Sequence, residues 1–191
     1  MKTNRLEAFS DGVIAIIVTI MVLELKVPHD TSSAALFERW PVFLSYVLSF
    51  VVVAIMWVNH HHMIHAARRA DAALLWSNNH LLFWMSLIPF ATAYMGETHG
   101  TPLAVAVYGG VLALASMAFT LMRGVIAGQH RDDADSITHH RRVQLKNLLS
   151  AGIYAGSVPM AFLSVRVSLA IFCLVPALYF LPERTFEKYS G

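Results

Sequence analysis

Six apolar runs of membrane-spanning length constrain this chain more than any other feature of its sequence. A helix needs about 20 residues to cross a hydrocarbon core about 30 Å thick. Such runs cover residues 6–26, 41–63, 74–96, 102–123, 145–165 and 167–182. Hydrophobic residues make up 57% of the 191 residues and charged residues only 14%, unlike a water-soluble globule. The sequence therefore predicts an all-α, polytopic membrane protein whose single domain, residues 1–191, has six transmembrane helices in a lipid bilayer.

Prolines and one glycine pair modify several of these predicted spans. Pro89, Pro159 and Pro176 each remove one helical hydrogen bond, so we expect kinks in spans three, five and six. The sixth run is short, and a chain with five spans is the alternative to six. The Gly109-Gly110 pair in span four is expected to allow close packing against a neighbouring helix.

The distribution of Lys and Arg predicts how the chain is oriented. With six spans, eleven of the 14 Lys and Arg residues fall on one side of the membrane and three on the other. Positive residues accumulate on the cytoplasmic side, so we expect a multi-pass protein of the cell membrane with both termini in the cytoplasm. On the outer side, residues 29–40 are expected to form a short helix capped by a hydroxyl group from residues 31–33.

The charge and the cysteine content exclude some kinds of partner. The formal net charge of +2 comes from residues in short connections, not from a basic groove with interleaved aromatics. We therefore expect no nucleic-acid partner. The single cysteine, Cys173, lies in an apolar stretch and is predicted to be a buried, unreactive thiol.

An ionisable residue inside the first span marks a candidate functional region. Asp11 lies about two turns into the span, where an unpaired charge costs at least a few kcal/mol, so it should face protein or water. Polar residues of spans two and three fall at the same predicted depth, near the cytoplasmic side. We expect them to form a buried polar network with the first span, made of Arg5, Ser10, Asp11, Trp57, His60, His61 and Asn78.

The spacing on span two suggests how this network is paired. Trp57, His60 and His61 are spaced i, i+3 and i+4, so they share one helix face. We predict that His60 or His61 pairs with Asp11, and that Arg5 tethers a neighbouring helix. In this interpretation the network stabilises the packing of the helices and does not itself carry out transport.

A second face of the first span carries a narrow stripe. Ile16, Thr19, Ile20 and Leu23 follow one another at helical spacing. Asp11 lies about 140° away from Ile16 around the helix, so the carboxylate and the stripe face different neighbours. By its composition alone, such a stripe is ordinarily core or lipid contact.

Four motifs in the first half of the chain resemble a known family. They are Arg5-x-x-x-Phe9-Ser10-Asp11-Gly12, Trp57-x-x-His60-His61, Leu75-Trp76-x-Asn78 and Pro89-Phe90-Ala91-Thr92-Ala93-Tyr94-Met95-Gly96-Glu97. Their residues and order are similar to the endosomal and lysosomal transmembrane potassium-channel family, in its bacterial single-repeat form. The resemblance covers spans one to three, whereas spans four to six match only in length and hydrophobicity.

The resemblance implies a potassium-permeable cation channel whose pore is formed by the first helix in a homotetramer. It implies a main hydrophobic constriction at Ile16, a hydroxyl layer at Thr19, and further rings at Ile20 and Leu23. The permeant species would be potassium and other monovalent cations. The Thr-Val-Gly-Tyr-Gly filter of other potassium channels is not in this sequence. We expect no catalytic residue, no cofactor and no metal site.

Two other functions fit parts of the sequence. A proton- or cation-coupled secondary transporter would also use buried Asp and His residues. A histidine-cluster membrane metalloenzyme would use the motif His61-His62-x-x-His65 together with His139-His140. Residues 60–62 are consecutive histidines that spread around a helix and do not converge on one metal ion, which counts against the enzyme.

Overall fold

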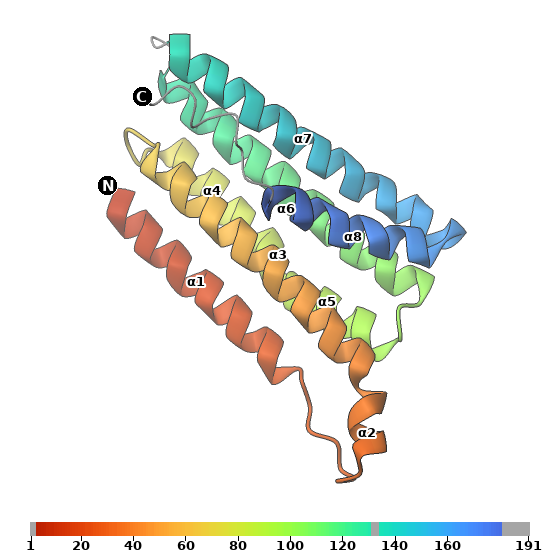
Figure 1. Ribbon diagram of the computed structural model, residues 1–191. Helices are drawn as coiled ribbons and strands as arrows, with labels where there is room; N and C mark the ends of the chain where they lie inside the picture. The colour runs from red at the N-terminus through yellow and green to blue at the C-terminus, as the bar shows by residue number, and fades with distance from the viewer. Residues whose placement is uncertain (1–2, 131–133, 181–191) are drawn as a thin grey trace.

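The computed structural model describes residues 3–130 and 134–180, and the regular structure in these ranges is entirely helical (Figure 1). The predicted all-α class is therefore confirmed. The elements are α1 (Thr3–Leu23), α2 (Ser33–Glu38), α3 (Trp40–His65), α4 (Ala72–Ser86), α5 (Ile88–Glu97), α6 (Pro102–Ala127), the 3₁₀ turn η1 (Gly128–His130), α7 (Ala134–Leu163) and α8 (Val165–Phe180).

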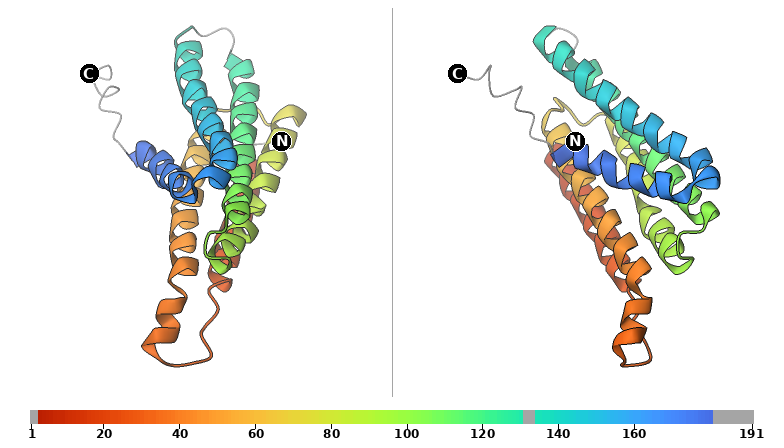
Figure 2. Two further views of the ribbon diagram at one scale, coloured as in Figure 1. Left: turned by 90° about the vertical axis from the view of Figure 1, so that its right-hand side faces the viewer. Right: turned by 45° about the vertical axis from the view of Figure 1, so that its right-hand side comes forward.

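The helices form an elongated bundle in which α1 lies at one edge (Figure 1). It packs against α3, α4 and α5, while α6 packs most extensively against α7 on the other side of the bundle. Helix α8 crosses the bundle obliquely, and the short α2 stands beyond the end at which α1 finishes (Figure 2). The start of α1 and the end of α3 therefore lie side by side at the opposite end of the molecule.

Three helices in the described ranges are long and apolar enough to cross a membrane: α1, α3, and α6 extended through η1 as Pro102–His130. The third predicted span is divided at Leu87 into α4 and α5, with Pro89 in the first turn of α5. Helix α7 begins with a polar stretch, and α8 is a shorter apolar helix. The count of six membrane crossings stays a prediction. The last predicted span, residues 167–182, runs beyond the described residues.

Local signals explain where two of the helices begin. Ser32 caps α2 by accepting a hydrogen bond from the backbone N–H of Ala35 at 3.2 Å, so the predicted short helix and its hydroxyl cap are confirmed. Asp71 caps α4 by accepting from the N–H of Leu74 at 3.0 Å. That hydrogen bond holds the pKa of the Asp71 carboxyl below its usual value, so the cap is charged at neutral pH.

The connection between α3 and α4 is held against the end of α6. The side-chain oxygen of Gln129 accepts hydrogen bonds from the backbone N–H groups of Arg68 and Arg69, at 3.0 and 3.3 Å. The side-chain amide of Gln129 donates to the carbonyl of Arg69 at 3.1 Å. One side chain thus satisfies three backbone groups of this connection, which fixes the position at which α3 ends.

Close packing in the second half of the bundle depends on Gly109. A Cβ atom added there would collide with the Ser157 hydroxyl on α7 and lie 3.2 Å from the ring of Phe172 on α8. The predicted packing role is confirmed for Gly109, whereas a Cβ at Gly110 would meet nothing within 4 Å. The predicted burial of Cys173 is wrong, since its side chain is exposed in the single chain.

The variant Gly109→Ala is expected to be less stable than the wild type by about 1–3 kcal/mol, because the added methyl group overpacks a filled interface. Gly110→Ala is the matched control, because the same change on the same helix meets open space. It should leave stability unchanged or raise it by up to about 1 kcal/mol. Thermal unfolding of both variants in detergent measures the difference, and equal stabilities would contradict the packing assigned to Gly109.

Candidate functional site

Helix α1 has two clearly different faces. One face is buried against α3, α4 and α5 and carries Leu6, Ser10, Ile14, Ile17 and Met21. The other face is uncovered in the single chain, although its side chains are almost all apolar. The exposed residues of α1 recur at helical spacing and are Asn4, Arg5, Ala8, Phe9, Gly12, Ala15, Ile16, Thr19, Ile20, Val22 and Leu23.

The Asp11 carboxylate sits between these two faces and is bound by a tryptophan of α3. The indole N–H of Trp57 donates to Oδ1 of Asp11 at 2.9 Å. The predicted pairing of Asp11 with His60 or His61 is therefore wrong. Helices α1 and α3 run antiparallel (Figure 1), so a residue farther along α1 meets one earlier on α3. Asp11 lies opposite Trp57, and the histidines lie nearer the start of α1.

A second contact joins three helices through fully buried polar side chains. Oδ1 of Asn78 on α4 lies 2.8 Å from Nε2 of His60 on α3 and 3.2 Å from the Ser10 hydroxyl on α1. The Ser10 hydroxyl also lies 2.9 Å from the Leu6 carbonyl. Ser10, His60 and Asn78 are all 0% exposed, so no water competes for these contacts. They fix α1 in its position against α3 and α4.

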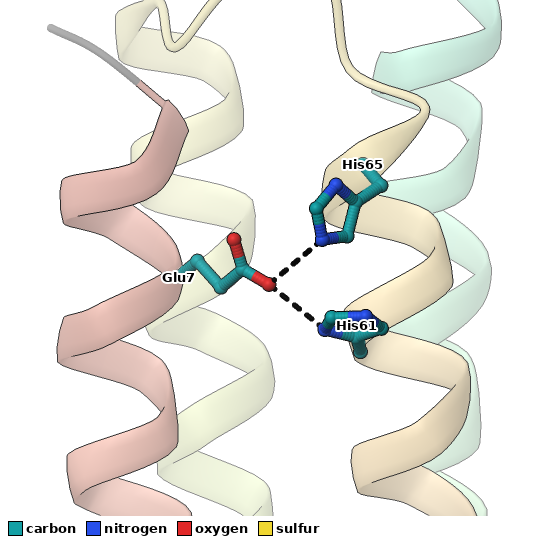
Figure 3. Close-up of side chains that lie close together, drawn as sticks. All are labelled: Glu7, His61 and His65. Carbon is teal, nitrogen blue, oxygen red and sulfur yellow. Dashed lines mark ion pairs between the residues drawn. The ribbon is translucent and has the colours of Figure 1, made fainter.

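His61 and His65, in the last two turns of α3, contact a glutamate and not Asp11 (Figure 3). Oε1 of Glu7 lies 2.8 Å from Nδ1 of His61 and 3.1 Å from Nε2 of His65. The side chains of Glu7, His61 and His65 are 17%, 44% and 60% exposed. Sequence reasoning missed Glu7 and His65 in this cluster. The signal was present, since His61 and His65 are spaced i and i+4 and so share a face.

The predicted stripe lies on the uncovered face of α1. Ile16, Ile20 and Leu23 are 58%, 43% and 75% exposed. The hydroxyl of Thr19 lies 3.1 Å from the Ala15 carbonyl and 2.8 Å from the Ile16 carbonyl, so its one proton is used within the helix. The stripe also extends farther toward the start of α1 than predicted, through Gly12 and the exposed ring of Phe9.

Arg5 stands apart from the polar network in the single chain. It is exposed on α1, and it makes no hydrogen bond or ion pair with another residue in the described ranges. Its predicted tether to a neighbouring helix is not made within these residues. Of the seven predicted network residues, the other six divide into three separate contacts: Asp11 with Trp57, Ser10 with Asn78 and His60, and His61 with Glu7.

Polar side chains also line a small cavity on the far side of α3 from α1. It lies among α3, α6, α7 and α8, and its volume is about 50 Å³. Asn59, Ser116, Asn147 and Ser150 are among its lining residues. A space of this size holds one or a few water molecules and does not form a conduit through the bundle.

Comparison with known proteins finds relatives along nearly the whole chain. Residues 5–89 match the family described as endosomal/lysosomal potassium channel TMEM175. A potassium channel from Chryseobacterium sp. (strain P1-3) is 38% identical over 188 residues, which cover 98% of this chain and 97% of that protein. A potassium channel from Chamaesiphon minutus is 34% identical, over 94% of this chain and 93% of that protein.

One solved structure is similar over almost its full length. The crystal structure of a lysosomal potassium-selective channel TMEM175 homolog from Chamaesiphon minutus matches with a TM-score of 0.85 at 28% sequence identity. The match covers 95% of this chain and 98% of that chain. The similarity therefore includes α6, α7 and α8, which lie beyond the residues that match the family.

Proposed function

The chain belongs to the family of the endosomal/lysosomal potassium channel TMEM175, and from this premise we propose that it conducts potassium and other monovalent cations across a membrane. Its apolar helices and its family make it a membrane protein. The members of the family and the relatives are ion channels, so the chain is not an enzyme and the metalloenzyme alternative is set aside.

The uncovered face of α1 is the observation that carries the proposed route for the ion. A helix at the edge of a bundle normally hides its apolar residues against neighbours or turns them to lipid. Here the row from Phe9 through Ile16 and Thr19 to Leu23, which carries one hydroxyl, lies on a face that is left open along the whole helix. Buried polar contacts hold the opposite face of α1 against α3 and α4, so the helix is fixed in position while its stripe stays uncovered.

Four copies of the chain around one axis would turn this open side into a pore. One copy of α1 cannot enclose a conduit. In a homotetramer the four α1 helices face one another, and each residue of the stripe becomes a ring. The resemblance to the bacterial single-repeat members implies a tetramer, which has this symmetry. The lipid bilayer would surround the remaining helices.

The order of side chains along the stripe gives each ring a role. A ring of Ile16 side chains closes the pore by excluding water, and it conducts when it widens enough to keep the ion hydrated. The Thr19 ring lies one turn farther along. Because each Thr19 hydroxyl donates its proton to its own helix, its oxygen lone pairs remain available to a partly dehydrated cation. Ile20 and Leu23 form further apolar rings toward the outer mouth.

The polar contacts at the start of α1 then serve as anchors. The Asp11–Trp57 bond and the Ser10–Asn78–His60 contacts hold α1 on α3 and α4, and they lie off the conduction path. The excess of Lys and Arg supports a cytoplasmic position for this end of the bundle and for both termini. The Ile16 ring is therefore reached from the cytoplasm past Gly12 and Phe9.

Ion flux into lipid vesicles tests the function. The purified chain is reconstituted, and a potassium gradient is imposed with no gradient of protons or sodium. We expect the potassium gradient alone to move charge across the membrane, with a flux that does not saturate as a carrier's does. A flux that requires a second, coupled ion would contradict the channel and support the secondary transporter.

The variant Thr19→Val is expected to lose most of its preference for potassium over sodium while still conducting. Valine keeps the shape of threonine and removes the oxygen that contacts the ion, so the difference in dehydration cost between the two ions is no longer offset. Reversal potentials with potassium on one side and sodium on the other measure the permeability ratio. Thr98→Val, in the connection after α5, is the control and should keep the wild-type ratio.

A further inference from the structure

We propose that Glu7, His61 and His65 form a binding site for a zinc-class divalent metal ion that fastens α1 to α3 (Figure 3). The three side chains come from two helices and point at one another. The two histidines occupy the last two turns of α3, and Glu7 reaches across from the first turns of α1. The site uses none of the stripe residues and none of the residues that contact Asp11 and Ser10 through hydrogen bonds.

The chemistry of the donor set matches zinc. Two imidazole nitrogens and one carboxylate oxygen are a ligand set that zinc binds readily, with a water molecule in the fourth position. Potassium, the proposed permeant ion, has no preference for imidazole, and magnesium and calcium favour sets made of oxygens. The site therefore selects against the ions that are most abundant around a potassium channel.

The distances are close to those that a tetrahedral ion requires. The three ligand atoms lie within 4.8 Å of one another, and Oε1 of Glu7 is 2.8 and 3.1 Å from the two nitrogens. With bonds of about 2.0–2.1 Å, tetrahedral ligands are about 3.3 Å apart, so the Glu7 oxygen needs to move only slightly away from the two nitrogens to admit the ion. His61 would bind through Nδ1 and His65 through Nε2, each as a neutral ring with its proton on the other nitrogen.

The surroundings favour an ion that enters from water. His61 and His65 are partly exposed at the end of the bundle, which leaves a side open for the ion and for a water ligand. The backbone that carries them is fixed, because Gln129 holds the connection that follows α3. Glu7 is the least exposed of the three ligands, so its position varies least.

A metal ion here would act on the helix that carries the proposed gate, and this consequence rests on the proposed function. Glu7 lies nine residues before Ile16 on the same straight helix. An ion that bridges Glu7 to α3 holds α1 in the position described here and resists the outward movement that widens the Ile16 ring. We therefore expect zinc to reduce potassium flux.

Direct binding measurements test the site without any flux assay. The full chain, purified with a tag that contains no histidine and treated with a chelator, is titrated with Zn²⁺ by calorimetry. We expect one Zn²⁺ per chain and a rise in the thermal unfolding temperature. His65→Ala and Glu7→Gln should each weaken Zn²⁺ binding by at least about 10- to 100-fold. Loss of a group that only supports a ligand already costs that much, and these variants remove a ligand itself. His62→Ala, next to the cluster and exposed, is the matched control and should bind normally.

Three results would overturn the site: no binding to the wild type at Zn²⁺ up to about 1 mM, unchanged binding in both His65→Ala and Glu7→Gln, or equal loss in His62→Ala. Flux in vesicles tests the coupling separately. Zn²⁺ should lower potassium flux in the wild type and in His62→Ala, but not in His65→Ala. Binding without any effect on flux would overturn the coupling, and a chain that binds zinc but conducts no potassium would contradict the proposed function alone.

Discussion

Vesicles that contain the Ile16→Asn variant are expected to take up potassium at least about tenfold faster than vesicles with the wild type. The proposed closed state is a dry ring of four isoleucine side chains, and an amide at each position lets water fill the ring. A tenfold rise corresponds to a barrier lowered by only about 1.4 kcal/mol, which is small beside the cost of dehydrating an ion. Single-channel recording should show the same change as more frequent or longer openings.

The control for this variant needs the same chemistry at a site that faces away from the proposed axis. Leu149 has the same exposed fraction as Ile16, 58%, and its helix, α7, lies on the side of the bundle opposite α1 (Figure 1). Leu149→Asn should therefore conduct as the wild type does. An Ile16→Asn variant with unchanged flux, in vesicles where the protein is present and folded, would show that the stripe is not the gate.

The second large effect is expected for Asn78→Ala. Its amide oxygen is the acceptor at which Ser10 of α1 and His60 of α3 meet, so the change removes the Ser10 contact to α4 and leaves the buried Nε2 of His60 without a partner. Each unsatisfied buried group costs about 1–3 kcal/mol in soluble proteins, and helix contacts in membranes average somewhat less. We expect a loss of about 1–3 kcal/mol in the free energy of unfolding and a smaller fraction of tetramer, because α1 is no longer held in place.

Asn79→Ala is the matched control for this prediction, because Asn79 is the next residue on α4 and its side chain is exposed. Its stability should stay within about 0.5 kcal/mol of the wild type. Unfolding in increasing concentrations of a denaturing detergent measures stability, and native mass spectrometry measures the fraction of tetramer. The anchoring role of the contact would be contradicted by two variants of equal stability and assembly.

The helical fold could be predicted from hydropathy, but the ends of the helices could not. Apolar runs report where a chain can cross a membrane, whereas a helix continues as long as its backbone hydrogen bonds do. Helix α6 therefore continues to Ala127, past the predicted end at residue 123, and α7 begins at Ala134, well before the predicted start at 145. Proline was the better guide, since Pro89 marks the point at which the third predicted span divides.

The two faces of α1 followed from helix periodicity, but the partners across helices did not. Periodicity separates Asp11 from Ile16 on a single helix, and the structure leaves the stripe uncovered as that separation requires. The pairing of Asp11 depends on the register between α1 and α3, and no helix wheel contains that register. A small shift in register changes the partner of the Asp11 carboxylate from a histidine to Trp57. The same shift brings His61 into contact with Glu7.

Chemical modification of Leu23→Cys tests most directly whether the stripes of four α1 helices line one pore. The only native cysteine, Cys173, is first replaced by alanine, and a positively charged thiol reagent is added from the outer side. Val22→Cys is the control, because Val22 is also exposed but lies about 100° away around the helix. We predict that the reagent blocks potassium flux through Leu23→Cys and leaves Val22→Cys unaffected. Modification of Leu23→Cys, verified by mass, with no change in flux would contradict a pore lined by the first helix.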